Sequence, residues 1–140
     1  MERMRVARLC FMVGNGSFLL LKRPSGKYNG DLWELPGGKL NEGELDWELA
    51  LRREVAEETG IETREGIVCV FQSEETVMFK DRKIIYEERI FRGGTDGEVR
   101  VILSDEHKDG VWVDRERALR FDLTLGARRF LEQMREIEMR

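Results

Sequence analysis

The 140-residue sequence contains two cysteines, two prolines and one histidine, and it lacks an apolar run of the roughly eighteen residues that a membrane-spanning helix requires. Cys10 and Cys69 both lie in apolar stretches, so we expect buried free thiols and not a disulfide or a cysteine metal site. His107 is the sole histidine. This residue type often transfers protons, but for a lone histidine a turn or capping role is favoured.

The net charge and the lack of separate segments narrow the possible partners and the domain organisation. The formal net charge is −4, which does not favour nucleic acid, and a polyanionic substrate would be repelled unless cations bridge it to the protein. Residues Met1–Arg5 lead directly into a strand pattern and do not resemble a signal peptide, which predicts a cytoplasmic protein. Because no repeat, linker or low-complexity segment is present, residues 1–140 are expected to form one domain.

The segment 37–61 carries the most information about chemistry. Glu54, Glu57 and Glu58 are spaced i, i+3 and i+4, which places them within one arc of about 100° on a helix. The same face carries apolar residues from the preceding turns, namely Trp47, Ala50 and Leu51. Like charges so close repel, whereas Mg²⁺ takes oxygen ligands from carboxylates and phosphates. We therefore expect a metal site and not merely a solvated acidic surface.

This helix has marked boundaries. Asp46 is expected to be its N-cap and Gly60 its C-cap. Ahead of the helix, the glycines of Pro36-Gly37-Gly38 predict a tight turn with accessible carbonyl groups. The unit is therefore expected to be loop, helix, loop.

The remaining chain predicts short strands and one further helix, which together suggest an α/β sandwich. Strands are predicted at 4–13, 17–23, 67–71 (buried), 76–80, 83–92, 99–103 and 111–113. Turns are predicted at Gly14-Asn15-Gly16, at Asp81-Arg82, and at Gly93, Gly94 and Gly97. Thr124 is expected to cap a final helix whose apolar face comprises Ala127, Phe130, Leu131, Met134 and Ile137.

The segment around the acidic helix resembles the Nudix box, G-x5-E-x7-R-E-U-x-E-E-x-G-U, in which U is apolar. The specified positions are matched in order by Gly38, Glu44, Arg53, Glu54, Val55, Glu57, Glu58, Gly60 and Ile61. One extra residue separates Glu44 from Arg53, and we assign it to Leu45 in the loop, so that the helix of the box stays intact. The similarity covers roughly residues 5–135, including Leu32–Lys39 before the box and Leu103–His107 after it.

The resemblance implies an α/β Nudix fold, an α/β/α sandwich in which helices cover a mixed β-sheet beside a catalytic loop-helix-loop. It also implies hydrolysis of a nucleoside diphosphate linked to another group, with Mg²⁺ as cofactor and Mn²⁺ able to replace it. By position, the metal ligands would be the carbonyl of Gly37 and the carboxylates of Glu54, Glu57 and Glu58. Glu106 or one of the box glutamates would be the general base, with Asp105 as a substitute at the same place.

Four other residues are candidates for the site. Arg53 could touch phosphate, but orienting Glu57 is favoured. Gly38, Lys39 and Arg23 are expected near the phosphates of the substrate, although a solvated Lys39 and an exposed Arg23 fit the sequence equally well.

Three functions follow from the resemblance. The first is a (deoxy)nucleoside triphosphate pyrophosphohydrolase that releases a monophosphate and pyrophosphate, with oxidised nucleotides such as 8-oxo-dGTP among its candidates, because the approach to the box is of the MutT type. The second is hydrolysis of ADP-ribose or another nucleoside diphosphate sugar; such members often carry a proline after the box, whereas Pro24 and Pro36 precede it. The third is a catalytically silent nucleotide-binding module, which only Leu45 supports. The expected partners are a small nucleotide and, by resemblance, a second copy in a homodimer, without a membrane or a stable nucleic-acid complex.

Overall fold

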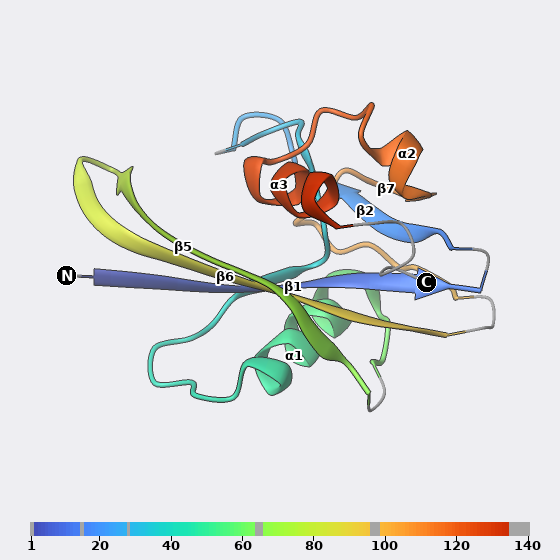
Figure 1. Ribbon diagram of the computed structural model, residues 1–140, viewed down its shortest axis with the longest axis horizontal. Coiled ribbons are helices and arrows are strands. Elements are labelled where there is room, and N and C mark those ends of the chain that lie inside the picture. Colours follow the sequence, from blue (N-terminus) through green and yellow to red (C-terminus); the bar gives the residue numbers. More distant parts are fainter. Residues whose placement is uncertain (1, 15, 28, 64–65, 96–98, 135–140) are drawn as a thin grey trace.

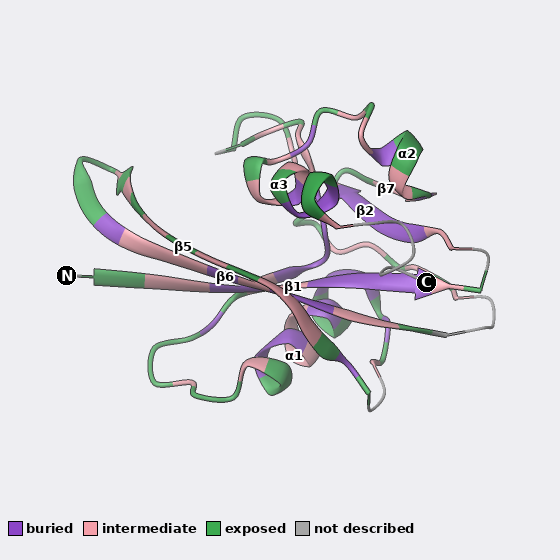
Figure 2. Ribbon diagram, viewed as in Figure 1, coloured by how far each residue is buried: buried purple, intermediate pink, exposed green. Residues whose placement is uncertain are grey.

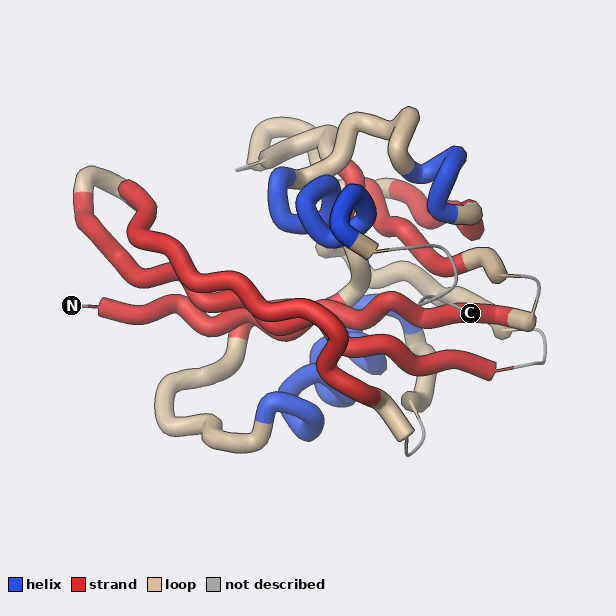
Figure 3. Tube along the Cα trace, viewed as in Figure 1, coloured by secondary structure: helices blue, strands red, loops and turns tan. Residues whose placement is uncertain are grey.

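A central β-sheet lies between two layers of helices in the computed structural model, which describes residues 2–14, 16–27, 29–63, 66–95 and 99–134 (Figure 1). Helix α1 (Trp47–Thr59) covers one face of the sheet. Helix α3 (Leu125–Gln133) and the short α2 (Arg115–Ala118) lie on the other side. Figure 3 shows the same layers along the chain trace. The predicted α/β/α sandwich is therefore confirmed.

The sheet is mixed, and β1 is the central strand of its main path. Among the described residues it has seven strands, with a main path in the order β3 (Trp33–Glu34), β2 (Phe18–Lys22), β1 (Glu2–Val13), β6 (Arg82–Thr95) and β5 (Val68–Phe79). Off this path, β4 (Gly37–Lys39) pairs with β1, and β7 (Asp109–Val113) pairs with β2. Strand β1 pairs in parallel with β6 along the whole length of β1, whereas the other pairs are antiparallel.

Strand β1 contributes alternate residues to two hydrophobic cores. Cys10 and Met12 pack into the core under α3, whereas Ala7, Leu9 and Phe11 pack into the core under α1. The middle of β1 is accordingly buried in Figure 2. Because both faces of this strand are covered, its sequence is nearly continuously apolar and does not alternate with polar residues.

Helix α1 begins and ends as predicted. The Asp46 carboxylate accepts a 3.1 Å hydrogen bond from the N–H of Leu49, and Gly60 has a φ of 73° with its N–H bonded to the carbonyl of Ala56. The last carbonyls of the helix, those of Glu58 and Thr59, accept hydrogen bonds of 3.0 and 2.9 Å from residues 104 and 102. The strand predicted at 99–103 is therefore wrong: this segment is irregular, and its backbone closes the end of α1.

The two glycines before the helix lie in a strand, β4, and not in the predicted turn. Gly37 and Gly38 pair with Arg8 and Ala7 of β1. A Cβ atom on Gly37, whose φ is 143°, would collide with the carbonyl oxygen of Ala7. A Cβ atom on Gly38 would collide with the carboxylate of Glu54. These glycines are therefore needed for close packing between β1, β4 and α1.

Strands β5 and β6 also differ from the strands and turns that the sequence predicted. The two strands predicted at 67–71 and 76–80 form one edge strand, β5, with an irregularity between Cys69 and Phe71. Val68 is 52% exposed, so this part is not a buried strand. Lys80 and Asp81 form the turn, one residue earlier than predicted, and both have positive φ. No turn occurs at Gly93 and Gly94, because both continue β6 beside β1; Gly97 lies outside the described residues.

Helix α3 matches the prediction. The hydroxyl of Thr124 accepts a hydrogen bond from the N–H of Ala127, and the apolar face of the helix packs on the sheet through Ala127, Phe130 and Leu131. Ile137 lies outside the described residues. Both cysteines are free; Cys10 is buried, which raises the pKa of its thiol to about 12, but Cys69 is only partly buried. Within the described parts of the chain, no helix has the length and apolarity that a membrane crossing requires.

Candidate functional site

The three glutamates of α1 differ strongly in exposure. The side chains of Glu58, Glu54 and Glu57 are 3%, 16% and 56% exposed, respectively. The buried stripe of the helix, which includes Leu51 and Val55, continues directly into Glu58. The acidic patch therefore extends the apolar face at Glu58 and partly at Glu54, whereas Glu57 faces solvent.

Glu58 links the helix to the glycine strand. Its Oε1 atom accepts a 2.7 Å hydrogen bond from the N–H of Gly37, and its Oε2 atom lies 3.2 Å from Nδ1 of His107. Burial raises the pKa of Glu58 to about 8, although Arg8 and the hydrogen bond from Gly37 act in the opposite direction. A buried carboxyl group with so strong a perturbation is a candidate for a functional role.

Glu54 and Glu106 bring further negative charge to the same place. Burial raises the pKa of Glu54, Arg53 opposes the rise, and the charges of Glu57 and Glu106 add to it. The charge of Glu106 also raises the pKa of Glu58. Glu106 is exposed, and its N–H donates a 3.3 Å hydrogen bond to the hydroxyl of Ser104. The turn at residues 104–107, which follows the segment that closes α1, thus carries Glu106 to the acidic residues of the helix.

Arg53 holds several of these acidic side chains. Its guanidinium group lies 2.9 Å from Glu44, 3.0 Å from Glu54 and 3.6 Å from Glu57. The predicted pairing of Arg53 with Glu57 is therefore present, together with two shorter contacts. Leu45 lies outside the helix and is 88% exposed, so the extra residue bulges outward while Glu44 still reaches Arg53.

The residues predicted to contact phosphate take different positions. Gly38 faces Glu54, and Lys39 is exposed. Nη1 of Arg23 lies 3.1 Å from Oε2 of the buried Glu34, so its guanidinium group forms an ion pair with that carboxylate. Asp105 is exposed beside Glu106.

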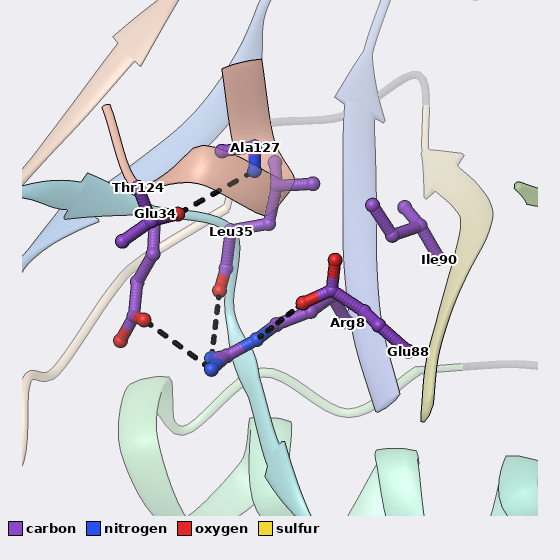
Figure 4. A pocket seen from close by; sticks show the side chains of 7 residues that line it. All are labelled: Arg8, Glu34, Leu35, Glu88, Ile90, Thr124 and Ala127. Carbon is purple, nitrogen blue, oxygen red and sulfur yellow. Dashed lines mark hydrogen bonds and ion pairs between the residues drawn. The ribbon is translucent and has the colours of Figure 1, made fainter. Parts of the chain in front are cut away.

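A buried ion-pair network on the α3 side of the site was missed by sequence reasoning. Arg8 lies between Glu34 and Glu88, with its Nη2 atom 3.3 Å from Oε1 of Glu34 and its Nε atom 3.9 Å from Oε2 of Glu88 (Figure 4). Nη1 of Arg8 also donates a 3.4 Å hydrogen bond to the carbonyl of Gly37. The pocket at this network has a volume of about 10 Å³, which holds roughly one water molecule and not a nucleotide.

His107 contacts this buried ion-pair network through Glu34. Its N–H closes a turn on the carbonyl of Ser104, as predicted, but its side chain is only 2% exposed and lies between two carboxylates. Nε2 lies 2.9 Å from Oε2 of Glu34, and Nδ1 lies 3.2 Å from Oε2 of Glu58. His107 therefore takes the predicted turn position, and its side chain in addition contacts two buried carboxylates, which the sequence did not predict. The three residues come from distant parts of the chain, so only the fold brings them together.

Two sequence signals could have pointed to this network. Arg8 is the one charged residue in the apolar run 6–13, and Glu34 interrupts the apolar segment 32–35. A single charge within such a run is expected to be buried beside a partner. His107 gives no comparable signal, because its neighbours in sequence are polar.

The donor atoms of the site fit a divalent cation. Glu54, Glu57 and Glu106 offer carboxylate oxygens, which Mg²⁺ and Mn²⁺ prefer, and one guanidinium group, that of Arg53, cannot balance their charge. A second group, comprising Glu34, Glu58 and His107, has ligand atoms that all lie within 4.8 Å of one another. Glu58 belongs to the second group and directly follows Glu57 on α1, so the acidic face and the buried network meet at this residue.

Comparisons with known proteins agree with this geometry. The family model described as NUDIX domain matches residues 3–134. The crystal structure of a MutT protein from Methanosarcina mazei Go1 has 31% sequence identity and a TM-score of 0.75, covering 94% of this chain and 92% of that chain. The solution structure of the E. coli ORF135 protein has 27% identity and a TM-score of 0.66, covering 94% of this chain and 88% of that chain.

A more distant structure shares the fold. The NUDIX domain of Shewanella oneidensis NrtR, complexed with ADP ribose, has 18% identity and a TM-score of 0.78, covering 99% of this chain and 90% of that chain. A search of curated proteins gives no match. Because the family model spans most of the sequence and a MutT protein is 31% identical over 94% of it, this chain belongs to the NUDIX family and is a Nudix hydrolase.

Proposed function

We propose that this Nudix hydrolase is a Mg²⁺-dependent pyrophosphohydrolase that converts a (deoxy)nucleoside triphosphate into the monophosphate and pyrophosphate. The observation that carries the proposal is the arrangement of Glu54 and Glu58 against the Gly37–Gly38 strand, with the charge of Glu106 beside them. The 31% identity with a MutT protein supports a nucleoside triphosphate as the substrate class.

The metal ligands in this proposal are the carboxylates of Glu54, Glu57 and Glu58 and the carbonyl of Gly37. When bound, the ion supplies neutralisation of phosphate charge and a bound water of lowered pKa. The chain supplies position: the N–H of Gly37 holds Glu58, and Arg53 holds Glu54 and Glu57. The Gly37 carbonyl already accepts a long hydrogen bond from Arg8, and its second lone pair remains for another contact.

Glu106 is the general base in this proposal, with a glutamate of α1 as the alternative. It is exposed to solvent, and its charge acts on both Glu54 and Glu58, which supports a role in accepting a proton from a water near the phosphates. A positioned base contributes roughly 10²–10⁴-fold to the rate. The phosphates would contact Gly38 and the exposed Lys39, whereas Arg23 is committed to Glu34.

The test is a panel of nucleotides incubated with the protein with and without Mg²⁺. The panel holds the common (deoxy)nucleoside triphosphates, 8-oxo-dGTP, ADP-ribose and a dinucleoside polyphosphate, and chromatography identifies each product. We expect a triphosphate to yield monophosphate and pyrophosphate only with the metal. Preferential cleavage of ADP-ribose would replace the proposed substrate class. Tight nucleotide binding without any product would favour the silent module.

A matched pair of variants assigns the activity to the site. Glu58→Gln removes one carboxylate while preserving shape, and we expect turnover to fall by at least 10²-fold with the fold retained. Glu48→Gln changes another glutamate of α1, which pairs with Arg52 at 4.0 Å, and should leave turnover unchanged. Near-normal turnover of Glu58→Gln at saturating Mg²⁺ would remove Glu58 from the proposed mechanism.

A further inference from the structure

We propose that His107 is a nitrogen ligand of the metal centre: Nδ1 of His107 and Oε2 of Glu58 form a subsite for a divalent transition metal ion, and Glu34 orients the imidazole ring. The proposal deepens the proposed function, because Glu58 is shared with the carboxylate cluster of α1. It adds a donor type that the Nudix box itself does not contain, since all of the box carboxylates offer oxygen.

The hydrogen bond to Glu34 determines which ring nitrogen is free. Glu34 also pairs with the guanidinium groups of Arg8 at 3.3 Å and Arg23 at 3.1 Å, and a carboxylate held between two such groups can only accept hydrogen bonds. Nε2, 2.9 Å away, must therefore carry the proton. In the neutral ring, the lone pair is then on Nδ1. A metal-binding histidine typically donates its other N–H to a carboxylate in this manner.

Nδ1 of His107 and Oε2 of Glu58 lie at a separation that suits two ligands of one ion. Nδ1 is buried and has no hydrogen-bond partner among the described residues, although Oε2 of Glu58 lies 3.2 Å away. Two donors bound to one ion at zinc-like bond lengths are separated by roughly 3.2–3.4 Å. An unpartnered buried nitrogen is costly, and a cation between these two atoms would satisfy both.

The ligand set predicts the order of metal affinity. Mg²⁺ prefers oxygen and gains little from imidazole, whereas Mn²⁺, Co²⁺ and Zn²⁺ accept nitrogen with increasing readiness. The protein should therefore bind Mn²⁺ more tightly than Mg²⁺ in the absence of nucleotide.

The sequence makes the test direct, because His107 is the only histidine. Pulsed electron paramagnetic resonance of tag-free protein, titrated with Mn²⁺ up to saturation, should show coupling to an imidazole nitrogen, which can come from no other residue. Absence of this coupling throughout the titration would overturn the proposal. This measurement needs no variant, so it does not depend on whether a substitution at a buried site folds.

Variants then test the role of Glu34. Titration calorimetry should show Mn²⁺ affinity falling by about 10–100-fold in Glu34→Gln, as for other orienting carboxylates, with a smaller change for Mg²⁺. Glu88→Gln is the matched control, because Glu88 also contacts Arg8, whereas the described carboxylates at His107 are Glu34 and Glu58; this variant should keep both the affinity and the nitrogen coupling. Equal losses in the two variants would overturn the orienting role of Glu34.

The outcome is separable from that of the proposed function. Mg²⁺-dependent release of pyrophosphate without nitrogen coupling would refute only the His107 ligand. Nitrogen coupling without hydrolysis of any nucleotide would refute only the proposed activity.

Discussion

Replacing Gly38 with alanine should separate activity from stability. The added Cβ would lie 2.6 Å from Cδ of Glu54, whereas ordinary contacts begin at 3.4 Å, so the carboxylate must move by about 0.8 Å. The obstacle is the end of a flexible side chain, and Gly38 does not have a positive φ, so the strand itself can accept alanine. A displacement of about 1 Å in a catalytic group can lower the rate by about 10²-fold, or about 2.7 kcal/mol of transition-state stabilisation.

The assay for Gly38→Ala combines steady-state hydrolysis of the best substrate from the panel with thermal unfolding. We expect kcat/KM to fall by about 10²-fold while the melting temperature changes little. Gly37→Ala is the contrasting neighbour, because its Cβ would meet the β1 backbone, which cannot rotate away. That variant should be destabilised by at least about 1–3 kcal/mol.

A double variant tests the reason for the loss. If Gly38→Ala acts by moving Glu54, the substitution should cause little further loss in a Glu54→Gln background, because the two changes affect one group. Full activity of Gly38→Ala, or an additive loss in the double variant, would refute the argument that the glycine provides space for this carboxylate.

Three further predictions test the network and the core. Arg53→Ala, which removes contacts to Glu44, Glu54 and Glu57, should lower turnover by about 10–100-fold without unfolding, measured by kinetics and circular dichroism. The pKa of Glu58 is raised from 4.5 to about 8, so the folded protein retains a proton that the unfolded chain releases. Thermal melts of the metal-free protein should therefore show stability falling as the pH rises from about 5 to 8. Glu58→Gln should make the stability less dependent on pH over this range. Phe130→Ala should lower the free energy of unfolding by about 3–5 kcal/mol in urea titrations, because Phe130 is fully buried against Phe71, whereas Leu125→Ala at an exposed position of the same helix should have little effect.

Signals that act over a few residues predicted the helix of the site well. Asp46 and Gly60 cap α1 through hydrogen bonds to residues three and four positions away, so their roles depend on little else. The glycines predicted the local structure less well, because glycine is favoured both in turns and where two backbones pack closely. Gly37, Gly38, Gly93 and Gly94 were all predicted in turns, and all lie in strands beside another element.

The extent of burial could not be predicted from helical spacing. Glu54, Glu57 and Glu58 share one arc of the helix, but β4 and the irregular segment 102–107 cover only one side of it. Glu58 is enclosed by these elements, whereas Glu57 remains in solvent. The difference in their environments depends on chain segments that lie before and after the helix.

The sequence by itself determined which carboxylates face the same way, since the spacing of residues on a helix follows from backbone geometry. It also determined the ends of that helix and the family to which the chain belongs. Only the tertiary structure decided that His107 lies between Glu34 and Glu58, and that Arg8 and Arg23 neutralise Glu34. His107 and Glu34 are 73 residues apart, and the strength of their interaction comes from the exclusion of water around them, which no local pattern of residues specifies.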